Sequence, residues 1–315
     1  MLQEGTVPEI LMLKAGCDKM APEKMSWRKN GDRYRLGTIP GAGIVPDERA
    51  LKIGGYHGLI AGAYDDPVFL AALTPLEGLW ARPGAEILSE GRNRVGRLTA
   101  PLSTGVAADI IVKEFSSRGV NKLKSLVLPS KAERAWRGAA ALVERGLGTA
   151  HPVAWLAQRK RGLVERSFFL SERIAGAVEV RGLFRELPPS ELEPLLGALA
   201  GFLSAVHAEG ILHRDLSDGN VLVRKIDAGG LEFFLLDTNR IRLRRRVGGL
   251  SRAKNLIRLG LPASHREYFL ARYFGGRPPV LPHLWYKINK SVFTSYIALK
   301  RRLRLRRLAR ALRIQ

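Results

Sequence analysis

The stretch Ile211–Asn220 reads ILHRDLSDGN and lies between two apolar segments. Before it, large apolar residues recur at helical spacing over residues 192–206, and Gly210 ends the pattern. After it comes a short apolar run, 221–223, which is typical of a buried strand. The stretch is therefore predicted to be a loop between a helix and a strand, on which Asp215 and Asn220 can turn toward different partners.

A second carboxylate ends the next apolar segment of the chain. Asp237 directly follows residues 233–236, FFLL, and a buried strand can hold its side chain rigidly. Phosphoryl transfer from ATP requires a carboxylate beside the attacking hydroxyl and oxygen ligands for Mg²⁺. In the pattern H-R-D-x-x-x-x-N, Asp215 would face the acceptor hydroxyl, whereas Asn220 and Asp237 would bind the metal. Turn capping explains each residue taken alone, but the combined pattern favours a kinase.

Upstream, alternating apolar and polar residues predict an antiparallel sheet. Strands are expected at 86–88, 94–98, 109–115, 153–157 and 167–170. Lys113 follows the β-branched run Ile110–Val112, where a lysine is unfavourable unless its charge has a partner. A kinase would use this lysine on the α- and β-phosphates of ATP. The alternative is an edge-strand lysine that reaches solvent and blocks strand pairing.

Two further features of this region have both a functional and a structural interpretation. Ser130 and Glu133 form a capping box at the start of an expected helix, and Glu133 is also the helix carboxylate expected to pair with Lys113. Gly91 and Gly96 stand where the first two strands join, so their backbone N–H groups could approach ATP phosphates. Two glycines five residues apart also occur in ordinary hairpins.

These elements predict an α+β fold of two lobes, protein-kinase-like, with a small antiparallel sheet and one main helix in the first lobe and mainly helices in the second. Residues 85–174 would form the first, ATP-binding lobe, and residues 175–315 the second, with the catalytic loop, the metal ligands and a basic C-terminal region. A second capping box, Ser190 with Glu193, is expected to start the long helix before the loop. Residues 1–84 are rich in glycine and proline and are interpreted as an N-terminal extension without an assigned role.

The sequence resembles the protein-kinase-like superfamily, and within it most closely the bacterial lipopolysaccharide kinase family, which phosphorylates Kdo or heptose sugars of the inner core. The resemblance runs from about residue 85 to residue 275 and rests on Ile111–Phe115 (IVKEF), Ser130–Trp136 (SKAERAW), His213–Val223 (HRDLSDGNVLV), Leu236–Arg242 (LDTNRIR) and Ser251–Leu259 (SRAKNLIRL). It implies that Asp215 is the catalytic base, that Asn220 and Asp237 are magnesium ligands, and that Lys113 binds the phosphates of ATP.

Departures from ordinary protein kinases indicate a substrate other than protein. Asp237-Thr238-Asn239 stands in place of Asp-Phe-Gly, Ser217 stands where a lysine is usual, and no Ala-Pro-Glu segment follows. An activation loop regulated by phosphorylation is therefore not expected. Two other interpretations stay open, namely a kinase of another small molecule or of protein, and a non-catalytic pseudokinase or basic nucleic-acid-binding module.

Positive charge is concentrated at the C-terminal end of the sequence. The net charge is +23, and residues 241–315 hold 20 Lys/Arg and one acid, Glu267, whereas the first 240 residues contribute 32 − 28 = +4. Such a basic block predicts an anionic partner. With the resemblance, the expected partners are anionic lipopolysaccharide or another sugar acceptor and, through the basic C-terminal region, the surface of the inner membrane; nucleic acid is not expected. Leucines of the tail 296–315 fall on two helical stripes, so packing on the lobe is an alternative to membrane binding.

Cysteine content and hydropathy bear on the compartment. The single cysteine, Cys17, cannot form an internal disulfide, and no Cys/His cluster has zinc-site spacing, so a cytoplasmic location is expected. No apolar segment has the length and continuity of a transmembrane helix, since Leu51–Leu73 is interrupted by Asp65 and Asp66. The expected location is therefore the cytoplasm, with peripheral contact to the cytoplasmic face of the inner membrane.

Overall fold

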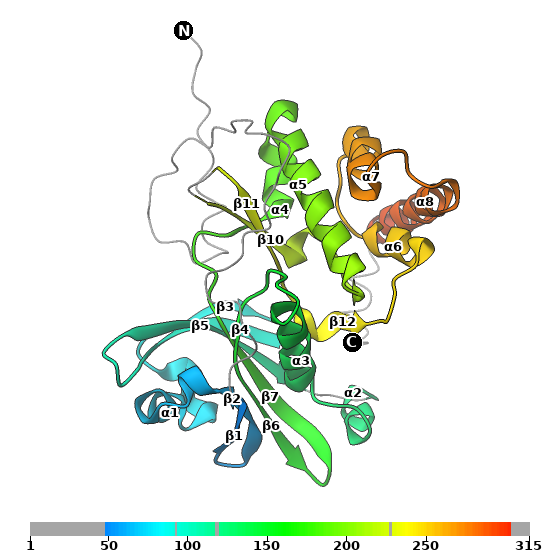
Figure 1. The fold of residues 1–315 in the computed structure, drawn as a ribbon. Coiled ribbons are helices and arrows are strands. Elements are labelled where there is room, and N and C mark those ends of the chain that lie inside the picture. The colour runs from blue at the N-terminus through cyan, green and yellow to red at the C-terminus, as the bar shows by residue number, and fades with distance from the viewer. Residues whose placement is uncertain (1–47, 92, 117–119, 227–228, 304–315) are drawn as a thin grey trace. The chain divides into compact units, whose positions relative to one another are not determined.

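The computed structural model describes residues 48–91, 93–116, 120–226 and 229–303. These residues divide into two compact units (Figure 1). The sheet unit contains the described residues up to Gly182 together with Leu222–Ile241. The helical unit contains Leu183–Val221 and the described residues from Arg242 onward.

The sheet unit is built around one large antiparallel sheet. Among the residues described, its seven strands have the spatial order β1-β2-β6-β7-β5-β4-β3. They are β1 (Glu48–Ile53), β2 (Tyr56–Ala61), β3 (Ala85–Glu90), β4 (Asn93–Pro101), β5 (Ala107–Ser116), β6 (Pro152–Lys160) and β7 (Leu163–Glu172). In β5, Ile110 and Val112 are fully buried and Ile111 between them is partly exposed, as a period of two requires.

The sheet contains two strands more than the five expected from the sequence. β1 and β2 form a hairpin around Gly54 and Gly55, and β2 pairs with β6 from Tyr56 opposite Gln158 to Ile60 opposite Ala154. Residues 48–61, within the segment interpreted as an N-terminal extension, therefore belong to the sheet. Their apolar runs are short and separated by glycines, so their pairing depends on a partner strand that is distant in sequence.

Helices cover both faces of this sheet. The described sheet unit contains α1 (Pro67–Leu73), α2 (Val120–Leu123), α3 (Lys131–Val143) and the 3₁₀ turns η2 (Gly62–Tyr64), η3 (Leu76–Ala81), η4 (Lys124–Leu126) and η6 (Thr238–Arg240). α1 and η3 pack in the core that contains Ile110 and Val112. α3 crosses the opposite face (Figure 1), where Trp136 packs in a cluster with Phe115 and Phe169.

A second, smaller sheet completes this unit. Three strands, β8 (Val178–Glu179), β10 (Val221–Lys225) and β11 (Leu231–Leu235), have the order β11-β10-β8 within the described chain. The end of β11 is fixed because the Leu235 N–H donates to the Gly148 carbonyl at 2.9 Å, and the Thr149 hydroxyl donates to the Leu235 carbonyl at 2.8 Å. This anchors the residues that immediately precede Asp237.

Helices form most of the described part of the helical unit. They are α5 (Pro189–Ala208), α6 (Gly249–Leu256), α7 (Arg266–Phe274) and α8 (Val280–Arg302), with the 3₁₀ turns η5 (Asp218–Asn220) and η7 (Ala263–His265) and the short strands β9 (Ile211–His213) and β12 (Ile241–Leu243), which pair with each other. α4 (Val180–Glu186) contains the first point at which the chain passes from one unit to the other. α5 packs on α7, and α6 packs on α8.

α5 leads directly into β9 and the loop that carries Asp215. The helix starts at Pro189, and no side chain caps it, so the expected Ser190–Glu193 capping box is wrong. Proline at the first helical position needs no N–H partner, which makes a polar cap unnecessary. Gly210 ends the helix as expected, with φ +75°, and a Cβ there would lie 2.1 Å from the Arg244 carbonyl oxygen. Only glycine fits this turn.

Candidate active site

The sheet unit brings together two of the residues singled out from the sequence. Lys113 on β5 forms an ion pair with Asp237, which lies two residues beyond the end of β11, and the two side chains are 23% and 26% exposed. β5 lies between β4 and β7, so Lys113 is not on an edge strand. The edge-strand alternative is therefore wrong. A lysine in a central strand needs a partner for its charge, and the Asp237 carboxylate is that partner.

The backbone around Asp237 is held by α3. Asp237 has φ +57° and ψ +42°, a left-handed conformation that aspartate tolerates better than most residues. The next residue, Thr238, is buried, and its hydroxyl donates to the Ala135 carbonyl at 2.8 Å. Gly138 lets η6 approach closely, because a Cβ there would lie 2.2 Å from the Thr238 carbonyl oxygen. Helix and turn together fix where the Asp237 carboxylate points.

Glu133 lies apart from this pair. Its backbone N–H is capped by Ser130, as the capping box predicted, and its carboxylate accepts from Arg137 at 2.5 Å. In the part of the chain that the structure describes, the ion-pair partner of Lys113 is Asp237 and not Glu133. Glu133 instead lines a depression of about 520 Å³ with other residues of the sheet unit, among them Trp155. Its role toward ATP stays a prediction.

The two glycines of the expected phosphate loop differ in their surroundings. A Cβ at Gly96 would lie 2.3 Å from the Trp80 ring and 2.6 Å from the Glu86 carbonyl oxygen, so packing alone requires glycine at this position. A Cβ at Gly91 would meet nothing within 4 Å. Contact of either glycine with phosphate stays a prediction.

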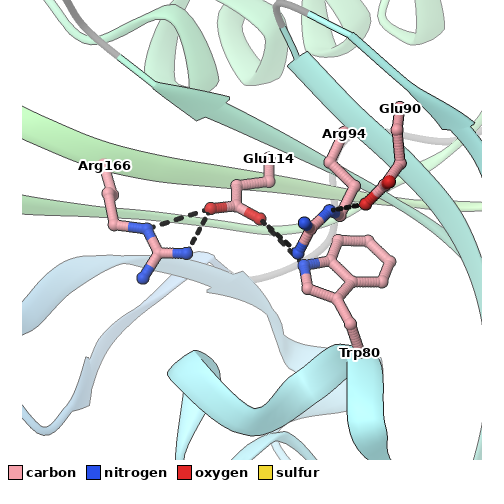
Figure 2. A network of polar contacts seen from close by, with 5 residues as sticks. All are labelled: Trp80, Glu90, Arg94, Glu114 and Arg166. Carbon is pink, nitrogen blue, oxygen red and sulfur yellow. Dashed lines mark hydrogen bonds and ion pairs between the residues drawn. The ribbon is translucent and has the colours of Figure 1, made fainter.

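Glu114, the residue after Lys113, lies on the opposite face of β5 and belongs to a closed polar network. Figure 2 shows Glu114, which is 5% exposed, accepting from Trp80 Nε1 at 2.8 Å and from Arg166 Nε at 2.9 Å. Arg94 lies 4.0 Å from the same carboxylate and binds Glu90 at 2.8 Å. Burial tends to lower the pKa of Arg166, but the hydrogen bond and charge of Glu114 outweigh it and raise that pKa. The network ties β4, β5 and β7 together beside Lys113.

In the helical unit, the catalytic-loop sequence folds onto itself. The Asn220 side-chain amide donates to the Asp215 carbonyl at 2.8 Å, and the Asn220 N–H donates to the Ser217 carbonyl at 2.9 Å. The Asp215 carboxylate forms an ion pair with Arg258, and the two side chains are 34% and 51% exposed. The five-residue spacing therefore serves to close the loop, and it leaves the Asp215 carboxylate accessible.

A second closed network supports this loop from the interior. Asn255 brackets the buried backbone of His213, because its side-chain amide donates to the His213 carbonyl at 2.8 Å and its oxygen accepts from the His213 N–H at 3.3 Å. The same oxygen lies 2.9 Å from His207 Nε2, and His207 Nδ1 lies 2.6 Å from the Tyr273 hydroxyl. Burial lowers the pKa of His207 to about 4. Neutral His207 therefore donates from Nε2 and accepts at Nδ1.

Sequence reasoning did not assign these supporting residues. Asn255 lies within the segment Ser251–Leu259 that carried part of the resemblance, but nothing local indicated that it holds His213. Glu114 stands next to Lys113, and its position in an apolar strand was a usable signal of a buried, partnered carboxylate. Tyr273 and His207 are distant in sequence, so their contact follows only from the packing of α5 on α7.

The oxygen donors present fit magnesium bound together with a nucleotide. Among the described residues, no group of three His, Cys, Asp or Glu side chains could hold a metal by itself. Mg²⁺ with a nucleotide needs only one or two protein oxygens, since phosphates and waters complete its shell. In the sheet unit, the partly exposed carboxylate of Asp237 beside Lys113 is a donor of that kind; in the helical unit, taken by itself, the carboxamide of Asn220 is another.

The fold is protein-kinase-like, with an antiparallel sheet and a single main helix in one unit and mainly helices in the other, and it confirms the α+β class expected from the sequence. A model of the lipopolysaccharide kinase (Kdo/WaaP) family matches residues 105–269, more than half of the chain. The protein belongs to this family and is therefore a kinase.

A solved structure of WaaP in complex with acyl carrier protein is similar to this chain. The two are 21% identical with a TM-score of 0.51, and the similarity covers 75% of this chain and 97% of that chain. At this identity the comparison shows the fold. No curated protein sequence matches the chain. In the part of the chain that the structure describes, no helix has the length and hydropathy needed to cross a membrane.

Proposed function

We propose that the protein transfers the γ-phosphoryl group of ATP to a hydroxyl of Kdo or heptose in the lipopolysaccharide inner core. The observation that carries the proposal is the loop at Asp215, which lies within the residues matched by the family and presents an accessible carboxylate on a backbone fixed by Asn220 and Asn255. A rigid carboxylate beside an acceptor hydroxyl is what phosphoryl transfer requires from the protein.

Each candidate residue has a proposed role. Asp215 accepts the proton of the sugar hydroxyl. Lys113 binds the α- and β-phosphates of ATP. Its contact with these phosphates replaces part of its contact with Asp237. Asn220 and Asp237 hold Mg²⁺, which neutralises phosphate charge when it is bound. Backbone N–H groups at Gly91 and Gly96 cover the phosphates. Glu133 contributes to the binding of ATP by the sheet unit.

Arg258 supports an anionic acceptor in this proposal. Its guanidinium binds Asp215, is about half exposed, and lies 6.0 Å from the centre of the Phe293 ring. A carboxylate or phosphate on the inner core can take up the exposed donors of this guanidinium and bring the sugar next to Asp215. The basic C-terminal region would place the same acceptor at the cytoplasmic face of the inner membrane.

The test is phosphate transfer from ATP to purified inner-core lipopolysaccharide, by wild type and by Asp215→Asn. Loss of the proton acceptor should lower kcat by about 10²-fold or more. Glu209→Gln is the matched control, because it makes the same change at an exposed carboxylate beyond α5 and should keep wild-type activity. Equal transfer by Asp215→Asn and wild type would contradict the assignment of the base. Acceptors that end in Kdo or in heptose distinguish the sugar.

A further inference from the structure

One face of α8 exposes a row of large apolar side chains. They are Leu284, Trp285, Ile288, Val292, Tyr296 and Leu299, and each is between 40% and 63% exposed. Successive helical residues are about 100° apart, so these six fall within an arc of about 120°. We call this surface the outer stripe. Exposed apolar residues are ordinary when they are scattered, but a continuous stripe on one helix face indicates a binding surface.

The opposite side of α8 is packed against the helical unit. Tyr286 is 2% exposed and Lys290 is 7% exposed, and α8 contacts α6 along this side. The Lys290 ammonium donates to the Ile257 carbonyl at 2.7 Å and to the Leu259 carbonyl at 2.6 Å. Rotation of α8 that buried the outer stripe would remove a buried cation from both of its partners. The helix is therefore fixed with its apolar stripe outward.

The charge around the outer stripe has one sign. Residues 268–315 contain no Asp or Glu. The nearest acid in sequence, Glu267, pairs with the Lys287 ammonium at 3.1 Å and lies 2.8 Å from His283 Nε2. Near the other end of α8, the Lys300 ammonium lies 5.7 Å from the centre of the Tyr296 ring. An apolar stripe with aromatic residues and flanking cations complements a surface whose outer layer is anionic and whose inner layer is apolar.

We propose that the outer stripe of α8 is an interfacial surface that binds anionic lipid bilayers. Its apolar side chains enter the boundary between headgroups and acyl chains, Trp285 and Tyr296 lie at headgroup level, and the flanking lysines and arginines bind lipid phosphates. This inference names the residues of the membrane contact that the proposed function includes. Only the identity of the membrane, the inner membrane, rests on that proposed function. The inference also assigns that contact to residues 284–299, most of which precede the tail considered in the sequence.

The test measures binding of the full-length protein to vesicles without lipopolysaccharide or ATP, so it does not depend on kinase activity. With vesicles of equal parts phosphatidylglycerol and phosphatidylcholine, the stripe variant Leu284→Ser, Ile288→Ser, Val292→Ser should bind at least about tenfold more weakly than wild type. The matched control is Val106→Ser, Leu243→Ser, Leu250→Ser, which replaces three other exposed apolar residues and should bind like wild type. Asp215→Asn should also bind normally.

Two further measurements define the mode of binding. Lys300→Gln with Arg302→Gln should weaken binding and reduce its dependence on salt, because these cations flank the stripe. An environment-sensitive dye at Ile288→Cys, with Cys17→Ser, should shift to shorter emission wavelength on vesicles, whereas the same dye at Thr294→Cys should not. Circular dichroism establishes that each variant is folded.

Two outcomes overturn the proposal. Equal vesicle binding by the stripe variant and wild type would show that the stripe is not the lipid surface. Absence of vesicle binding by wild type, with concentration-dependent self-association that the stripe variant loses, would identify the stripe as an interface between two copies of the chain. Loss of sugar phosphorylation together with normal vesicle binding contradicts the proposed function alone.

Discussion

In each unit of the protein, a partly exposed ion pair can be compared with a polar network around a buried residue, and the two differ in the burial and number of partners of their central residues. Lys113–Asp237 and Asp215–Arg258 are partly exposed pairs. In the two networks, Glu114 and His207 are themselves buried, and each bonds to two neighbouring side chains. Buried polar groups are costly unless every partner is present, whereas a partly exposed charge can exchange its partner for a ligand.

Residues proposed to act on the substrates therefore differ from residues that hold them in place. Lys113 and Glu114 are adjacent on β5, yet one has an exchangeable contact and the other is locked among Trp80 and two arginines. Substitution of an open-pair residue should therefore reduce activity with little effect on stability. Substitution within a closed network should do the reverse.

The largest effect is expected for Lys113→Met. Removal of the cation proposed to bind the phosphates should lower kcat/KM by about 10³-fold, on the order of 4 kcal/mol in transition-state stabilisation. The free energy of unfolding should change little. Lys122→Met is the matched control, because it removes a lysine of the same unit whose ammonium pairs with the Glu165 carboxylate at 3.1 Å. Similar losses of activity in both variants would remove the distinction between the two lysines.

Glu114→Gln should have the opposite profile. It removes the buried charge that accepts from Trp80 and from the partly exposed Arg166 guanidinium, so the free energy of unfolding should fall by about 1 to 3 kcal/mol, as measured in urea. Activity per folded molecule should be retained. Glu86→Gln changes an exposed carboxylate of the same sheet and should leave stability near wild type. A stable but inactive Glu114→Gln protein would place this network in the catalytic machinery instead.

The His207 network should make the helical unit sensitive to acid. The pKa of His207 is about 4 when folded, against an ordinary value of 6.5, so the unfolded chain binds a proton between these pH values and the native protein does not. Stability should therefore fall as pH decreases from 6.5 toward 4. Relative to His207→Gln, wild type should lose about 2 kcal/mol between pH 7 and pH 5 in urea titrations. Parallel pH profiles for the two proteins would show that His207 does not contribute.

Among the substitutions of buried residues, the smallest change in the free energy of unfolding is expected at Gly138, where α3 holds the segment after Asp237. Gly→Ala within a helix normally stabilises by about 1 kcal/mol, and Gly201→Ala in α5 should do so, because nothing lies within 4 Å of its Cβ. Gly138→Ala should instead destabilise by about 1 to 2 kcal/mol, since its methyl group would push against the Thr238 carbonyl. It should also lower activity by displacing Asp237. Stabilisation by both substitutions would mean that η6 moves without cost.

The sequence predicted the features that depend on neighbouring residues. The helix start at Ser130 and the hairpin turn at Arg161-Gly162 follow from local chemistry, and the structure confirms both. The motif around Asp215 was equally local, and the family match confirms the kinase class that it indicated. The start of α5 was the exception, because proline supplied the function expected of a capping side chain.

Features that depend on long-range packing were not predictable. The pairing of β2 with β6 joins segments that are far apart in sequence, and the expected Glu133 partner of Lys113 gave way to Asp237 for the same reason. The last helix, α8, shows most clearly that helical periodicity alone does not identify the buried side of a helix. Ile297 and Leu299 could each mark the buried side of the tail, and only the contacts of Lys290 show that Leu299 belongs to the exposed side.

The left-handed backbone of Asp237 determines which inactive variant is suited to trapping a bound sugar. Alanine at this position would remove the carboxylate and also disfavour φ +57°, so a loss of function could come from a displaced turn. Asparagine accepts the same backbone conformation and keeps the shape of the side chain while it removes the charge. Asp237→Asn is therefore the substitution with which crystals of an acceptor complex can report the undisturbed geometry of the enzyme.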